Sequence, residues 1–191
     1  MEVEPIVEGL WRWTAVHPQW KPGEGWDAEV ACVYAEDPGA VVLIDPLVPA
    51  DEAERFWRAL DRDVERLARP VAVLVTSHWH GRSAAEIEGR YAATREPPPG
   101  VQAIPVSHEE VVYWLPAYAA LVAGDALLGG PDELRLQPPD WLEGDYPAFV
   151  AAMGNLLELP VERVLPSHGE PVLDRAREAL AHAHHSAATL T

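Results

Sequence analysis

The chain has 191 residues, of which 48% are hydrophobic, and its 31 acidic and 14 basic side chains give a formal net charge of −17. This length and apolar content predict one folded domain, spanning residues 1–191, with a sizeable core. The negative charge disfavours nucleic acid and anionic membranes as partners, and no apolar run is long enough to cross a bilayer. We expect a cytoplasmic protein, because the acidic start lacks the features of a signal peptide and Cys32, the single cysteine, allows no internal disulfide.

Strands and helices are predicted to alternate along the chain. In the first half, the strands fall at 8–16, 28–35, 40–44 and 71–75, and the helices at 51–69 and 83–93. In the second half, the strands fall at 101–106, 111–115, 119–123 and 161–165, and the helices at 146–157 and 173–188, with a proline-rich loop at 129–140. Asp51 and Ser83 have side chains that can cap the first two helices.

A short buried strand followed by two histidines organises this pattern. Val71–Val75 is an unbroken apolar run, typical of a strand buried on both faces, and His78 and His80 follow it directly. Sites in α/β sheets form at the carboxyl ends of strands. Two imidazoles at positions i and i+2 of one loop can bind a borderline-soft cation such as zinc. The alternative is that both histidines only hydrogen-bond to the backbone of their loop.

Other predicted strands also lead to residues of the metal-ligand type. Asp125 ends the strand at 119–123, His168 follows the strand at 161–165, and His108 lies just before the strand at 111–115. Each has an ordinary interpretation as well. Asp125 could only close a turn, His168 could bond only to Asp125 or to backbone, and His108 could be a polar turn residue. Glu109 and Glu110 are the next candidates if His108 is not a ligand.

Together these stretches resemble the metallo-β-lactamase fold superfamily of metallohydrolases. The similar motifs are Val41–Asp45, Thr76–Ser83, Leu121–Asp125 and Val164–Pro171, and the resemblance covers nearly the whole chain. It implies an α/β fold, the four-layered αββα sandwich of that superfamily, with its site along one edge. It further implies a structural role for Asp45. The metal ligands that it implies are His78, His80, His108, Asp125 and His168.

The chain departs from the two-metal pattern of that superfamily at Arg82 and Ser83. The superfamily has an aspartate and a histidine at these positions. Arginine stays protonated and cannot bind a metal, and serine is a poor zinc ligand, so we expect about one zinc per chain. Arg82 could instead pair with Asp125, or bind an anionic substrate group and stabilise developing oxyanion charge.

These features predict a hydrolase with a single zinc that acts on a small molecule. It would cleave an ester, thioester, amide or related bond through a metal-bound hydroxide, with Asp125 and Arg82 as the catalytic residues. Asp125 would orient the attacking water and take its proton. The loss of two ligands leaves a second class open, namely a degenerate, non-catalytic member that acts as a metal-free or structurally metallated binding protein. The oligomeric state stays open as well.

Overall fold

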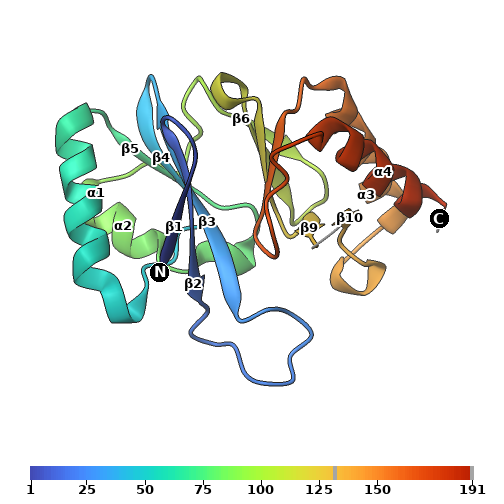
Figure 1. The fold of residues 1–191 in the computed structure, drawn as a ribbon, viewed down its shortest axis with the longest axis horizontal. Coiled ribbons are helices and arrows are strands. Elements are labelled where there is room, and N and C mark those ends of the chain that lie inside the picture. The colour runs from blue at the N-terminus through green and yellow to red at the C-terminus, as the bar shows by residue number, and fades with distance from the viewer. Residues whose placement is uncertain (131–132, 190–191) are drawn as a thin grey trace. The chain divides into compact units, whose positions relative to one another are not determined.

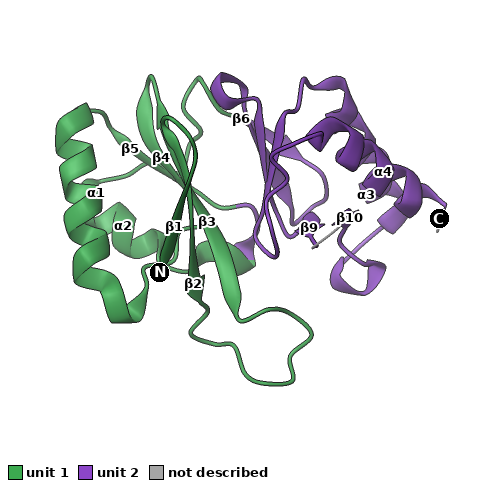
Figure 2. Ribbon diagram, viewed as in Figure 1, with its two compact units in different colours: residues 1–75, 79–101 green, residues 76–78, 102–191 purple. Residues whose placement is uncertain are grey.

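The computed structural model describes residues 1–130 and 133–189 of the chain (Figure 1). Residue contacts divide it into two compact units, of which unit 1 holds residues 1–75 and 79–101 and unit 2 holds residues 76–78 and 102–191 (Figure 2). The single domain expected over residues 1–191 stays a prediction. Within the described residues, no helix is long and apolar enough to cross a membrane.

Unit 1 is built on a five-stranded sheet in the order β1-β2-β3-β4-β5. Its strands are β1 (Glu2–Val7), β2 (Leu10–Val16), β3 (Glu29–Asp37), β4 (Ala40–Ile44) and β5 (Val71–Leu74). The first four are antiparallel neighbours, and β5 pairs parallel with β4. Every residue of β4 and β5 is buried, as their unbroken apolar runs predict. The helices α1 (Ala53–Leu67) and α2 (Ala84–Tyr91) pack on this sheet through Phe56, Leu60 and Ile87.

Three features of unit 1 differ from the sequence prediction. Strand β1 was not expected, because none of its residues is buried and two of them are the acidic Glu2 and Glu4. Asp51 lies in a 3-10 turn before α1, which begins without a side-chain cap. Ser83 precedes α2, but its hydroxyl accepts a hydrogen bond from the backbone N–H of Val48 at 2.9 Å, so it holds two loops together and caps no helix.

Unit 2 is built on a four-stranded sheet in the order β11-β8-β7-β6. Its strands are β6 (Gln102–Pro105), β7 (Val111–Leu115), β8 (Ala120–Gly124) and β11 (Arg163–Pro166). Strand β11 runs parallel to β8, and the other pairs are antiparallel. The helices α3 (Tyr146–Gly154) and α4 (Ala176–Ala188) pack against the sheet through a core that includes Phe149, Met153 and Leu180.

A small antiparallel pair, β9 (Leu127–Gly129) and β10 (Leu134–Leu136), replaces part of the proline-rich loop that we expected at 129–140. Residues 131 and 132 of that loop lie outside the described residues. The expected helix at 146–157 ends at Gly154 and continues as a 3-10 turn, Asn155–Glu158. The last helix begins at Ala176, three residues later than expected, because Arg175 has a left-handed backbone with φ of 51°.

Strand β8 ends in a close approach that only glycine permits. Gly124 has φ of +54°, and a Cβ at this position would overlap the side chain of Thr76. Thr76 is buried. Its backbone carbonyl oxygen accepts a hydrogen bond from the N–H of Val111, the first residue of β7, at 2.8 Å. Thr76 cannot move aside without disturbing this bond, so the contact fixes the end of β8 in unit 2.

We expect Gly124→Ala to lower the free energy of unfolding by at least about 2 kcal/mol, because it combines left-handed strain with a steric overlap. Gly89→Ala in α2 is the control, because a Cβ at Gly89 meets nothing within 4 Å. That change should raise stability by about 0.5–1 kcal/mol through helix propensity. Urea unfolding of the three proteins measures both effects, and equal stability of Gly124→Ala and the unchanged protein would contradict the close approach.

Candidate functional site

His80 is held in unit 1 by a buried carboxylate. Its side chain is almost fully buried, and its Nδ1 lies 2.9 Å from Asp45 Oδ2. Asp45 directly follows β4, is itself buried, and has φ of 52°, a left-handed conformation that aspartate tolerates better than most residues. A histidine that binds a metal through one ring nitrogen commonly bonds to a carboxylate through the other. The contact fits the structural role expected of Asp45 and orients His80.

Arg82 is anchored to the backbone of unit 1. Its Nη1 donates to the carbonyl oxygens of Ala31 in β3, at 3.3 Å, and of Asp45, at 3.1 Å. These bonds place a positive charge beside the loop that holds the His80–Asp45 contact. Asp125, the partner expected for Arg82, belongs to unit 2, so their pairing stays a prediction.

Cys32 lies beside the same guanidinium but is a poor nucleophile. Its side chain is buried, and its Sγ accepts a hydrogen bond from the Leu47 N–H at 3.3 Å. Burial raises the pKa of the Cys32 thiol to about 11, and the nearby Arg82 offsets only part of this rise. Because the thiolate is the reactive form, Cys32 is not a candidate catalytic residue.

In unit 2, a tight turn between β6 and β7 presents His108 and Glu109. The hydroxyl of Ser107 accepts hydrogen bonds from the N–H groups of Glu109, at 3.2 Å, and Glu110, at 3.0 Å. The Val106 N–H donates to the Glu110 carbonyl oxygen at 2.9 Å and closes the turn. The backbone of this turn is therefore satisfied internally, which leaves the side chains of His108 and Glu109 to project from it.

Glu109 lies between two of the predicted ligands. Its Oε1 is 3.9 Å from His78 Nδ1 and 3.8 Å from His108 Nε2. The Glu109 side chain is only 18% exposed, whereas those of His78 and His108 are 55% and 63% exposed, so the carboxylate is the inner member of the group. His78 and His108 thus both lie near one carboxylate oxygen of Glu109, and both rings are exposed to solvent.

Glu143 completes this cluster, although no sequence signal pointed to it. Its carboxylate and ligand atoms of His108 and Glu109 all lie within 4.8 Å of one another. Glu143 belongs to the loop before α3, and a Cβ at the adjacent Gly144 would contact His108 Nδ1 at 3.4 Å, so this loop packs against the His108 ring. The sequence pointed to Glu109, which adjoins His108, as a next candidate, whereas the position of Glu143 depends on a loop distant in sequence.

His168 and Asp125 form a second polar pair in unit 2. His168 Nε2 lies 3.5 Å from Asp125 Oδ1, and both side chains are largely buried. Backbone hydrogen bonds join their loops, because the Ser167 N–H donates to the Gly124 carbonyl oxygen at 2.9 Å. Of the predicted ligands, unit 2 therefore brings His78 and His108 each to Glu109, and Asp125 to His168.

The donor set of the cluster fits a divalent transition metal. His78 and His108 offer imidazole nitrogens, and Glu109 and Glu143 offer carboxylate oxygens, a combination found in zinc sites. The separations near 3.8 Å between Glu109 and the two histidines are only somewhat longer than those between atoms that share one ion. The rings of His78 and His108 are exposed and have room to rotate toward the Glu109 carboxylate.

Comparison with solved structures identifies the fold. The structure of DIM-1 metallo-β-lactamase is 15% identical in sequence, with a TM-score of 0.68 over 100% of this chain and 98% of that chain. For TMB-1 the identity is 16% and the TM-score 0.65, over 99% of this chain and 97% of that chain. A metallo-β-lactamase from Erythrobacter litoralis is 15% identical, with a TM-score of 0.63 over 98% of this chain and 92% of that chain.

This likeness confirms the predicted α/β fold class of the metallo-β-lactamase type and the resemblance on which that prediction depended. No protein-family model matches the chain, and no curated protein matches it. At identities of 12% to 16%, the likeness concerns the fold. The predicted roles of His78, His80, His108, Asp125, His168 and Arg82 stay predictions.

We expect Cys32 to resist alkylation in the folded protein. At pH 8, three pH units below a pKa of about 11, about one thiol in a thousand is ionised, and the sulfur is also shielded by burial. Iodoacetamide labelling followed by mass spectrometry should be at least about 100-fold slower in the native protein than in urea. Equal rates in the two conditions would show that Cys32 is accessible and reactive.

Proposed function

We propose, from the metallo-β-lactamase fold of this chain and the donor cluster of unit 2, that the protein is a metal-dependent hydrolase of a small molecule. The observation that supports this most strongly is that ligand atoms of His108, Glu109 and Glu143 all lie within 4.8 Å of one another, with His78 Nδ1 3.9 Å from Glu109 Oε1. The solved structures in the comparison are of metallo-β-lactamases, which supports hydrolysis as the type of reaction.

His78, His108 and Glu109 are the proposed metal ligands, with Glu143 as a further donor. Imidazole and carboxylate donors together favour zinc, and we expect about one ion per chain. A bound zinc ion would supply Lewis acidity to the scissile group. His80 also stays a predicted ligand, and its contact with Asp45 is of the kind that orients a metal-binding imidazole.

Asp125 is the proposed general base. It directly follows Gly124, which packs against Thr76 two residues before His78, so the loop of Asp125 adjoins the loop of His78. His168 Nε2, 3.5 Å from Asp125 Oδ1, holds the orientation of the carboxylate. Asp125 would then accept a proton from the attacking water. Arg82 is proposed to hold an anionic group of a substrate, and the bond cleaved is proposed to be an ester, thioester, amide or related bond.

We expect the purified protein to contain about one zinc per chain and the variants His108→Ala and Glu109→Gln to lose most of it, because each removes one donor. Elemental analysis of protein prepared without a nickel column measures this. His185→Ala is the matched control, since His185 is an exposed histidine on α4, remote in sequence from the cluster. It should keep the zinc content unchanged.

Absence of metal from the unchanged protein, together with no binding of added zinc, would contradict this proposal. It would favour the second class, a metal-free binding protein with this fold. Zinc that survives both His108→Ala and Glu109→Gln would place the ion elsewhere in the chain and overturn the ligand assignment.

We expect Asp125→Asn to lower kcat by about 10²–10⁴-fold while the zinc content stays the same, because the amide cannot accept the proton. The measurement is hydrolysis of a panel of small ester, thioester and amide substrates, with a chelator-treated sample as the metal-free reference. Glu162→Gln, at an exposed carboxylate next to β11, is the control for the loss of one negative charge. Unchanged kcat in Asp125→Asn would exclude Asp125 as the base.

A further inference from the structure

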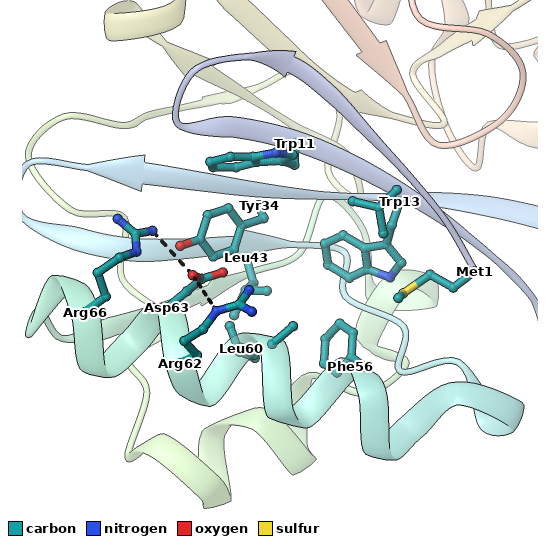
Figure 3. Close-up of a pocket in the computed structure, with 12 residues that line it drawn as sticks. Met1, Trp11, Trp13, Tyr34, Leu43, Phe56, Leu60, Arg62, Asp63 and Arg66 are labelled. Carbon is teal, nitrogen blue, oxygen red and sulfur yellow. Dashed lines mark hydrogen bonds and ion pairs between the residues drawn. The ribbon is translucent and has the colours of Figure 1, made fainter.

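Unit 1 contains a cavity of about 300 Å³ between its sheet and α1, which the proposed hydrolase site does not use (Figure 3). Its walls are mainly apolar, and four of the twelve lining residues are aromatic. The sheet contributes Trp11, Trp13 and Tyr34, and α1 contributes Phe56. A volume near 300 Å³ is at the small end of ligand pockets, which range from about 300 to 1,000 Å³, so the cavity suits a single ring or a short chain.

The aromatic walls are held in place by contacts with one another and with the backbone. The indole N–H of Trp13 donates to the Leu47 carbonyl oxygen at 3.0 Å, and the Trp13 ring packs on Phe56 with the ring centroids 5.6 Å apart. Trp11 packs edge-on against Tyr34 with the centroids 5.4 Å apart. Because these side chains are fixed, the cavity is preorganised, and a ligand would not have to order them on binding.

Charged side chains lie at one end of this cavity. Figure 3 shows Arg62 and Arg66 on either side of Asp63, whose Oδ1 is 3.7 Å from Arg62 Nε and 3.5 Å from Arg66 Nη2. Arg66 is also paired closely with Glu36. The Tyr34 hydroxyl donates to Glu36 Oε1 at 3.4 Å, and burial raises the pKa of Tyr34, so the phenol stays neutral.

Arg62 has weaker ion pairs than Arg66, the other arginine at this end of the cavity. Its side chain is 73% exposed, and its contact with Asp63 is longer than a hydrogen bond. Arg66 is already paired with Glu36, so the charged side chains at this end of the cavity, Arg62, Asp63, Arg66 and Glu36, carry no net charge, in a chain whose net charge is −17. Attraction of an anion to this end therefore depends on Arg62, whose guanidinium can turn from its long contact with Asp63 to a ligand.

We propose that this cavity binds a small monocarboxylate with an apolar body. The body would lie among Trp11, Trp13 and Phe56, where burial removes apolar surface from water. The carboxylate would pair with the guanidinium of Arg62, which can offer two parallel N–H donors to it. The inference is independent of the hydrolase proposal, because all of these residues belong to unit 1 and none is a proposed metal ligand or base.

Isothermal titration calorimetry with 4-phenylbutyrate and its neutral counterpart, 4-phenyl-1-butanol, tests this on the full chain. We expect both to bind, with the carboxylate about three- to fivefold tighter, as suits an ion pair that is partly exposed. Arg62→Gln should remove this preference. Arg58→Gln is the matched control, since Arg58 lies one turn earlier on α1, is 74% exposed and pairs with Glu54 outside the cavity.

Filling the cavity tests its location. Ala59→Trp places a bulky side chain at a residue that lines the cavity and should abolish binding of both probes. Ala59→Met is a milder second variant, and circular dichroism confirms that each variant is folded. Absence of binding by the unchanged protein, or binding that survives both cavity-filling variants, would overturn the site. Equal affinity for acid and alcohol, or a preference that survives Arg62→Gln, would overturn the choice of a carboxylate.

Discussion

The candidate site of unit 2 depends on the packing of one buried residue, Thr76. Its side chain occupies the space that a Cβ at Gly124 would need, and its carbonyl oxygen bonds to the N–H of Val111. Gly124 precedes Asp125, Thr76 precedes His78 by two residues, and Val111 follows the turn that carries His108 and Glu109. Two interactions of Thr76 therefore join three loops. The proposed chemistry depends on this arrangement, because the ligand-bearing segments lie outside the strands and α-helices.

The two histidines of the organising motif have different carboxylate neighbours. His80 contacts the buried Asp45 in unit 1, whereas His78 lies near Glu109 in unit 2. The spacing of the motif predicted two imidazoles for one cation but gave no information about the acidic partners. Asp45 directly follows β4, and Glu109 lies in the turn between β6 and β7. The Asp45 carboxylate orients the His80 ring, which suits a ligand, whereas Glu109 is itself a proposed ligand beside His78.

The prediction succeeded where local pattern determines structure. Apolar runs identified β4 and β5, and the polar residues expected after strands include Asp45, which follows β4, and Asp125 and His168, which lie 3.5 Å apart. The prediction failed where the contact of a side chain depends on a residue far away in the sequence. Ser83 has a side chain that commonly caps helices, yet its hydroxyl accepts a hydrogen bond from the N–H of Val48, 35 residues away. Glu143 lies near His108 although 35 residues separate them, and no spacing in the sequence encodes that approach.

The most direct test of the proposed metal centre is an anomalous difference map at the zinc absorption edge, from crystals of the full chain grown with zinc. We expect one strong peak about 2.0–2.2 Å from a ring nitrogen of His108 and from a carboxylate oxygen of Glu109. A ring nitrogen of His78 should lie at a similar distance. No peak near these residues, in crystals whose zinc content by elemental analysis is at least one per chain, would contradict the assignment.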